Sequence, residues 1–473
     1  MPDRARDEGP AVLQLELRWW SNPVFPVLVF GALVAAWTWA LPEDQFTEWG
    51  VRPAFLTEHL GIAVVGVLAM CVGILVLTLR TVGATSTRVI LSDTAVRRLR
   101  ALQITFFSLV VAAYVLWVLV AVRTGASAAL VLDVLAGERG AVSNLKDVSA
   151  PVAGVTTLTQ LAPVVAGISV VLSKAGRQSR AWVLPVVVAL SLGRALLYGE
   201  RLALIEVVIP VLLLHALFAG AGSRVKRLTA RALPLLAVPA LWATFAVFEY
   251  TRSWAARNDG SHGTFTQYVT SRLIGYYATS INNSALYYNV AHDRPHIAYY
   301  PVQGLWEAPI VGDVVRRVFG EPSIGGVPVG EWWAGEVAQQ GSVEFVNTGT
   351  VLVVAADLGY VGMVLYFLAI GLAVGALYAA AARGRVAGLI GYAVVFVGLL
   401  EMSRILYLGQ GRFLVTAVGV AVTAIVLHRP ERAPTVEATA RPGLAPPPRF
   451  LVPAGPPNPE PSVVPAPAEG DRA

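Results

Sequence analysis

Charged residues are scarce in this chain of 473 residues. Asp, Glu, Lys and Arg together make up 14% of it, whereas 56% of its residues are hydrophobic. Soluble globular domains are usually about one quarter charged. The shortage of charge, with a mean hydropathy of +0.62, excludes an ordinary soluble domain. It predicts an all-α polytopic membrane protein.

Cysteine is almost absent as well. The single cysteine, Cys71, lies inside an apolar run, which excludes an intramolecular disulfide and gives no support to a cysteine-based metal site. The sequence also lacks an internal repeat, a glycine-rich phosphate loop and an HExxH motif. We therefore expect neither a metal nor a cofactor.

Long apolar stretches are plentiful, in contrast. A helix needs about 20 apolar residues to span a bilayer, and about ten stretches approach or exceed that length. They run over residues 23–42, 60–79, 102–122, 152–173, 181–198, 202–220, 232–250, 349–379, 386–401 and 411–428. The sequence thus predicts about ten transmembrane helices, seven of them in residues 23–250 and three in 349–428, after a cytoplasmic segment over 1–22.

The charge of the connecting loops predicts the topology. The chain has a formal net charge of +6, but its basic residues form short clusters between apolar runs and do not follow one face, so we expect no nucleic-acid partner. Five loops are basic: "TLRTVGATSTRVILSDTAVRRLR", "SKAGRQSR", "SRVKRLTAR", "ARGR" and "HRPER". They follow every second helix, and positive charge favours the cytoplasmic side. A multi-pass protein of the cytoplasmic membrane with both termini inside is predicted.

Two segments depart from the plain alternation of helix and loop. Residues 251–348 form one long outward region, in which "TFTQYVTSRLIGYYATSINNSALYYN" predicts an amphipathic helix at the bilayer surface. A loop of that length is typical of a lid or binding element. Residues 429–473 are rich in proline and alanine, which predicts a disordered cytoplasmic tail.

Arginines interrupt the apolar pattern on the side predicted to face outward. Arg194, Glu200 and Arg201 lie in one short hairpin. Another carries Glu401, Arg404 and Arg412. Four arginines against two glutamates leave positive charge unbalanced, which predicts an anionic ligand. Guanidinium groups suit phosphate because they form bidentate hydrogen bonds with it. The alternative is internal ion pairing, of Glu200 with Arg194 or Arg201 and of Glu401 with Arg404.

The long outward region supplies further candidates for a binding site. Arg272 precedes Tyr276 by one helical turn, and aromatic rings such as that of Tyr276 stack on sugar rings. The alternative for these aromatic residues is a belt at the membrane interface. His292 and His296, together with Glu200, are the candidates for a general base.

Several of these pieces together resemble the Wzy-type oligosaccharide repeat-unit polymerases. The segment "EFVNTGTVLVVAADLGYVGMVLYFLAIGLAVGALY" looks like a hallmark of that family, in which an asparagine and a threonine lead into a helix with an Asp-aromatic-Gly-x-x-Gly element. The matching residues here are Asn347, Thr348, Asp357, Gly359 and Gly362. Leu358 stands where the family usually has an aromatic residue. "LGRALLYGERLALIE" is similar to the family's Gly-x-Arg element, through Gly193 and Arg194.

The resemblance implies a GT-C-like membrane glycosyltransferase that joins oligosaccharides carried on polyprenyl pyrophosphate. Fixed positive charge would then stabilise the departing pyrophosphate. The expected catalytic residues are Arg194, Arg201, Arg404 and Glu200, and the expected substrate-binding residues are Arg412, Arg272, Tyr276, His292 and Asn347. Expected partners are the lipid-linked oligosaccharides, the lipid bilayer, a flippase and a chain-length regulator. The related O-antigen ligases share the architecture, and an anion transporter is a further alternative.

Overall fold

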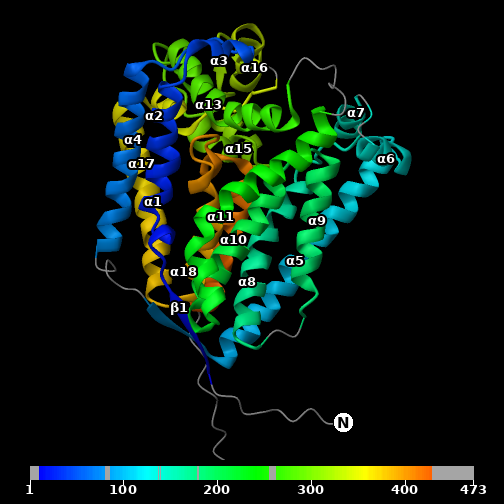
Figure 1. The fold of residues 1–473 in the computed structure, drawn as a ribbon, viewed down its shortest axis with the longest axis vertical. Helices are drawn as coiled ribbons and strands as arrows, with labels where there is room; N and C mark the ends of the chain where they lie inside the picture. The colour runs from blue at the N-terminus through cyan, green and yellow to red at the C-terminus, as the bar shows by residue number, and fades with distance from the viewer. Residues whose placement is uncertain are drawn as a thin grey trace, which may run out of the picture. The chain divides into compact units, whose positions relative to one another are not determined.

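The computed structural model describes residues 10–79, 86–136, 138, 140–177, 180–254, 263–342 and 344–428. Residues 1–9 and the tail predicted over 429–473 fall outside these ranges. Long helices run roughly side by side through the described part of the chain (Figure 1). The first is one helical segment made of α1 (Val24–Val27), η2 (Leu28–Leu33) and α2 (Val34–Trp39). The others are α4 (Thr57–Thr78), α5 (Asp93–Arg123), α8 (Ala162–Lys174), α9 (Val183–Leu197), α10 (Leu202–Leu217), α11 (Arg224–Glu249), α17 (Thr350–Ala382), α18 (Val386–Leu400) and α19 (Gly411–His428).

Shorter elements join and cover this bundle. The helical ones are η1 (Trp19–Ser21), α3 (Glu43–Glu48), α6 (Ala128–Ala136), α7 (Ala141–Val148), η4 (Thr156–Leu161), η5 (Phe218–Ala221), η6 (Tyr250–Trp254), α13 (Phe265–Ala291), η7 (Tyr300–Val302), α14 (Gln303–Trp306), α15 (Val311–Phe319), α16 (Val329–Gln340) and η8 (Tyr407–Gly409). The strands are β1 (Ala11–Glu16), β2 (Ser86–Leu91), β3 (Ser323–Ile324) and β4 (Val327–Pro328). The pairs β1–β2 and β3–β4 are antiparallel. Neither of these two small sheets was predicted from the sequence.

The described helices have the lengths and composition of a polytopic membrane protein. Seven are long and apolar enough to cross a membrane, and three further apolar segments are shorter, Val24–Trp39, Val183–Leu196 and Val386–Leu400. Each of these overlaps one of the predicted stretches. Two spanning helices begin earlier than predicted, because α5 and α11 include the basic residues before their apolar runs. Ser92 and Ser223 cap them by accepting hydrogen bonds from Ala95 N (3.2 Å) and Lys226 N (3.4 Å).

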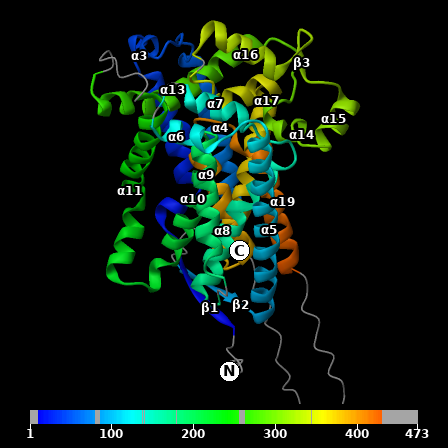
Figure 2. The same ribbon diagram turned by 90° about the vertical axis from the view of Figure 1, so that its right-hand side faces the viewer.

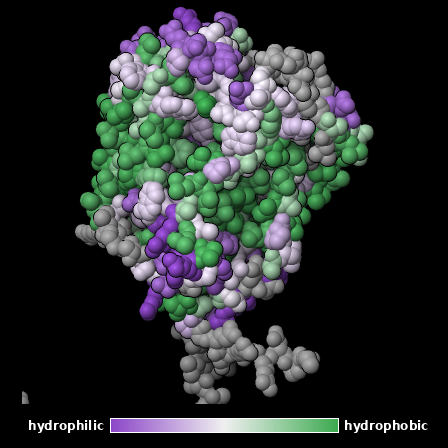
Figure 3. Space-filling model, in the orientation of Figure 1, coloured by the Kyte–Doolittle hydropathy of each residue, from purple (hydrophilic) through white to green (hydrophobic). Residues whose placement is uncertain are grey.

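An apolar surface lies between two polar ends. On the face drawn in Figure 3, hydrophobic residues form a broad zone with hydrophilic residues above and below it. Large apolar side chains are exposed on several spanning helices, among them Leu68, Val72, Val115, Leu119, Leu235, Val238, Leu365, Val418 and Ile425. Burying such side chains in hydrocarbon is favourable. This surface is the one that a lipid bilayer would cover.

The two ends of the bundle differ in structure (Figures 1 and 2). The cap end carries α3, α13 and α16, and the strand end carries β1 and β2. Contacts between segments far apart in the sequence join the basic loops at the strand end: Gly384 packs against the backbone of Arg88, and Arg100 Nε donates to the carbonyl of Arg177 (2.9 Å). The common location of these loops agrees with the alternation of charge along the chain.

Helix α13 is not the surface helix that the sequence predicted. All eleven residues from Ala278 to Tyr288 are buried, and this half of the helix packs against α17. Its polar residues serve the interior: Asn282 Oδ1 accepts from the backbone nitrogens of Ala54 (2.7 Å) and Phe55 (3.1 Å). The sequence of α13 mixes aromatic and polar residues, as an amphipathic surface helix does. In the structure, its amides and hydroxyls bind backbone groups and not water.

Glycines allow α4 and α17 to approach each other closely. A Cβ on Gly73 would lie 2.4 Å from the carbonyl oxygen of Leu368, and one on Gly371 would lie 2.2 Å from that of Met70. Small residues permit such contact between membrane helices. Nearer its N-terminal end, α17 breaks at Gly359, whose φ of 70° favours glycine. The break allows the chain before it to turn into the cap end.

Candidate functional site

A cavity of about 430 Å³ lies where the α9–α10 turn, α10, α11, α13, α14 and the segment between α18 and α19 meet. Its walls combine guanidinium, carboxylate, amide and phenol groups with apolar side chains. The polar lining residues are Glu200, Arg201, Thr244, Tyr276, Tyr277, Gln303, Glu307, Asn347, Glu401, Arg404, Gln410 and Arg412. We call it the arginine cavity. Its size falls in the range of about 300 to 1,000 Å³ that is usual for ligand sites.

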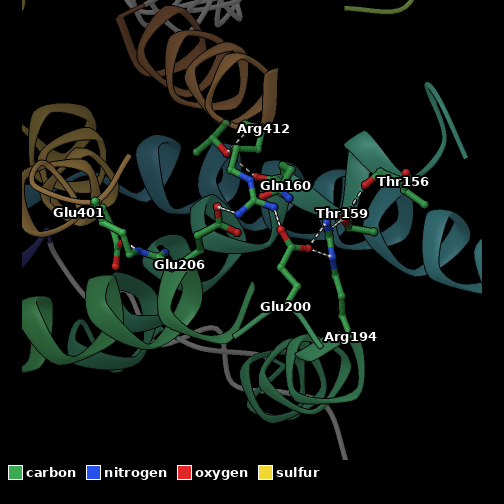
Figure 4. A network of polar contacts seen from close by, with 10 residues as sticks. Thr156, Thr159, Gln160, Arg194, Glu200, Glu206, Glu401 and Arg412 are labelled. Atoms are coloured by element: carbon green, nitrogen blue, oxygen red, sulfur yellow. Dashed lines mark hydrogen bonds and ion pairs between the residues drawn. The ribbon is translucent and has the colours of Figure 1, made fainter. Parts of the chain in front are cut away.

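Glu200 joins two arginines at one side of this cavity (Figure 4). Its Oε2 lies 2.8 Å from Nη2 of Arg194 and its Oε1 contacts Nη2 of Arg412. Arg194 also donates from Nη1 to Oγ1 of Thr159 (2.5 Å). Gln160, in the amide orientation that satisfies both neighbours, accepts from Arg194 Nη1 (3.1 Å) and donates to Glu206 (3.0 Å). The network fixes the start of α19 against α9, α10 and η4.

A second network is centred on Glu249, whose side chain is fully buried at the end of α11. One carboxylate oxygen contacts Arg201, and the other lies 2.9 Å from Nε of Arg272. The guanidinium of Arg201 also lies over the rings of Phe245 (4.1 Å) and Tyr276 (5.2 Å). Cation–π contacts of this kind gain strength when they are desolvated. Arg201 is therefore held in a defined orientation on the cavity wall.

The guanidinium group of Arg404 has a different arrangement, with a single ion pair that involves its Nε. Its Nε donates to Oε2 of Glu401 (2.5 Å). Within the part of the chain that the structure describes, no residue accepts a hydrogen bond from either terminal amino group of Arg404. The pKa of Arg404 lies above its usual value: burial alone would lower it, but the neighbouring Glu401 and Tyr277 favour the charged form. Arg404 thus presents a permanently charged fork with free donors to the cavity.

The prediction of unbalanced positive charge is wrong. It counted only Glu200 and Glu401, but Glu206 and Glu249, from within α10 and α11, also contact the arginines. Arg272 is paired as well, with Glu344 (2.5 Å) in addition to Glu249. The alternative of internal ion pairing is confirmed for Arg194 with Glu200 and for Arg404 with Glu401.

Most of the predicted site residues meet at this cavity. Those that line it are Arg201, Arg404, Glu200, Arg412, Tyr276 and Asn347. Arg194 and Arg272 are not among the lining residues. Arg194 contacts Glu200, which lines the cavity, and Arg272 contacts Glu249, which does not. His292 is not among them either. Its ring stacks on Tyr288 at 4.6 Å and its Nδ1 is 2.8 Å from the carbonyl oxygen of Tyr288.

His296 and Asp357 belong to the support of the cavity. Nδ1 of His296 is 3.2 Å from the carbonyl oxygen of Ala356. Asp357 accepts hydrogen bonds from the phenol of Tyr287 (2.7 Å) and from the backbone nitrogen of Tyr300 (2.7 Å). These contacts tie η7 to α17. They position the next segment, which brings Gln303 and Glu307 to the cavity.

Sequence reasoning missed several residues of this region. Glu206 and Glu249 carried a usable signal, since each is an isolated carboxylate in an apolar stretch, and such residues are costly unless they are paired. Glu307 was missed because it lies in the long outward region, where a carboxylate can face water and needs no cation. Gln303 Nε2 donates to it (2.6 Å), and the phenol of Tyr299 donates to it as well (3.3 Å). Glu307 has no cationic partner among the described residues.

Comparison with known proteins adds no relative: no family model, no curated protein and no solved structure matches the chain.

Proposed function

We propose that the chain is a metal-independent membrane glycosyltransferase that polymerises oligosaccharide repeat units carried on polyprenyl pyrophosphate. The observation that carries the proposal is the arginine cavity, in which a guanidinium with free donors faces aromatic, amide and carboxylate groups. Charge-assisted hydrogen bonds contribute about 1.5 to 3 kcal/mol each, and Arg404 has donors left for them. Aromatic and amide groups suit a sugar.

In this proposal the cap end faces outward and the strand end faces the cytoplasm, with ten membrane-spanning segments between them. The assignment follows the basic loops that gather at the strand end. The cavity then lies near the outer face of the membrane. Leu241 and Phe245 of α11 line it, and they provide an apolar wall for the first isoprene units of the carrier.

The proposed reaction joins a growing glycan to a new repeat unit. A hydroxyl oxygen of the acceptor sugar forms a bond with the anomeric carbon of the donor, whose bond to the pyrophosphate oxygen breaks. The electron pair leaves with the pyrophosphate, where Arg404, Arg201 and Arg412 stabilise the developing charge. The acceptor proton passes to a carboxylate. Glu307 suits this role better than Glu200, which two arginines already engage.

Deletion of the gene in its host tests the proposal by the glycans that accumulate. A polymerase deletion should leave single lipid-linked repeat units exported and the long polymer missing. Deletion of a ligase would leave polymer on its carrier, and deletion of a transporter would keep the precursor inside, protected from added glycosidase. Unchanged chain lengths, in a strain without a second polymerase, would refute the proposal.

The same strain tests the role of Glu307. Complementation with Glu307→Gln should leave polymer missing although the protein reaches the membrane. Complementation with Glu331→Gln, a change of another carboxylate in the same outward region, should restore polymer. Full polymer with Glu307→Gln would remove Glu307 from the mechanism and leave the polymerase proposal standing.

A further inference from the structure

A second cavity, of about 760 Å³, lies at the strand end. Its walls come from α10, from the first half of α11, from β1 and from the end of α8. The lining residues include Val12, Leu13, Lys174, Leu212, His215, Phe218, Lys226, Leu233 and Leu236. We call it the lysine cavity. It shares α10 and α11 with the arginine cavity, at the opposite end of those helices.

Lysine is rare in this protein, which makes its position here informative. The chain contains three lysines, Lys146, Lys174 and Lys226, against 33 arginines. Two of the three line this one cavity. A general preference for positive charge in cytoplasmic loops is met by arginine everywhere else, and it does not account for two lysines in a single cavity.

Among the residues that the structure describes, no carboxylate lines the lysine cavity or pairs with its lysines. No Asp or Glu is among the described residues that line it, and neither Lys174 nor Lys226 forms an ion pair with any described residue. Glu16 lies on the same strand as Leu13, but it is paired with Arg18 at 2.7 Å. An ammonium group is a compact point charge that binds phosphate without a fixed geometry.

The remaining walls are apolar and adjoin the lipid-facing surface. Leu212, Phe218, Leu233 and Leu236 line the cavity, and Leu212 and Leu236 are also exposed at 42% and 49%. Figure 2 shows α11 at the edge of the bundle, beside α10. A ligand here would therefore have its charged group near the lysines and its apolar part against the helices.

We propose that the lysine cavity binds an anionic membrane phospholipid. The phosphate headgroup lies at Lys174 and Lys226, and the acyl chains lie along α10 and α11. Basic cavities between membrane helices at the cytoplasmic side suit anionic headgroups for this electrostatic reason. The inference is independent of the proposed glycosyl transfer, because it depends on the charges and walls of this second cavity and on the cytoplasmic position that the basic loops predict for the strand end.

Native mass spectrometry of the purified full chain in detergent tests the proposal. Phosphatidylglycerol, which is anionic, and phosphatidylcholine, which has no net charge, are added separately. We expect one retained phosphatidylglycerol per protein and no such retention of phosphatidylcholine. The double variant Lys174→Gln/Lys226→Gln should bind phosphatidylglycerol about tenfold or more weakly. Lys146→Gln changes the third lysine, which lies over the ring of Tyr198, and should bind as the unmodified protein does.

Three outcomes would overturn the proposal. They are equal retention of the two lipids, undiminished binding by the double variant, and displacement of phosphatidylglycerol by excess inorganic phosphate. The last would identify a phosphate site that does not recognise the lipid. The comparison of the two lipids on the unmodified protein needs no variant, so the test holds even if the double variant fails to fold.

Discussion

The two cavities share α10 and α11, but the positive charges of one are paired with carboxylates and those of the other are not. Every arginine of the arginine cavity contacts a glutamate, which comes from α10, from the end of α11 or from a neighbouring turn. The lysines of the lysine cavity contact no described carboxylate. Paired guanidinium groups are fixed in orientation, as a site that stabilises charge in a transition state requires. An ammonium group is a point charge on a flexible side chain and needs no fixed geometry to hold a lipid headgroup.

The ion pairs of the arginine cavity also affect the stability of the folded state. Removing one partner of a buried ion pair leaves an uncompensated charge in a low dielectric, which is strongly destabilising. An exposed lysine carries no such penalty, since water solvates it whether or not a partner is present. The folded state should therefore depend on the carboxylates of the arginine cavity and hardly at all on the lysines.

Glu249→Gln should have the largest effect. It removes the buried carboxylate shared by Arg201 and Arg272, so we expect a loss of about 3 to 5 kcal/mol in the free energy of unfolding. Thermal unfolding of the detergent-purified protein measures it. Glu344→Gln is the matched control, because it also removes a partner of Arg272 but from a side chain that is 31% exposed. Its cost should stay within about 1 kcal/mol. Similar losses in the two variants would show that the burial of Glu249 is not what matters.

Arg404→Lys should come next, as an effect on activity. The ammonium keeps the charge beside Glu401 but loses the planar fork, so under the proposed function polymer formation should fall about a hundredfold with normal amounts of protein. Arg194→Lys is the comparison. Arg194 lies behind the cavity wall with Glu200, Thr159 and Gln160 as acceptors, so its replacement should reduce the amount of folded protein more than the activity of each molecule. The reverse pattern would make Arg194 the residue that meets the substrate.

Much of the fold and of the arginine cavity could be predicted from the sequence. The features that could not be predicted were missed for a physical reason. Apolar length predicted the spanning helices, and loop charge predicted which loops gather at one end, because both depend on composition over many residues. The two hairpins with Arg194 and Arg404 were found because charge stands out against an apolar background. The partners of the arginines were missed for a related reason: Glu206 and Glu249 were counted as parts of apolar stretches, although an isolated carboxylate there needs a cation nearby.

The lysine cavity and the burial of α13 depend on contacts between distant segments. Lys174 and Lys226 were recognised as members of two separate basic loops, and nothing in either loop indicates that one cavity holds both. In α13, the pattern of aromatic and polar residues fits a membrane surface as well as it fits a buried helix whose amides bind backbone groups. The burial of Ala278 to Tyr288 and the position of Asn282 beside Ala54 distinguish the two.

Lys174→Gln/Lys226→Gln should have the smallest effect on the free energy of unfolding. A small effect would confirm that the two cavities differ in how their charges are paired. In detergent free of anionic lipid, we expect the free energy of unfolding to change by no more than about 0.5 kcal/mol, as for most exposed substitutions. Added phosphatidylglycerol should then raise the unfolding temperature of the unmodified protein but not that of the variant, because a ligand that binds only the folded state stabilises it. A lipid-free loss as large as that of Glu249→Gln would mean that the lysines belong to an internal charge network. The positive charges of both cavities would then be paired with carboxylates of the protein, and the lysines would have no unpaired charge with which to bind a lipid.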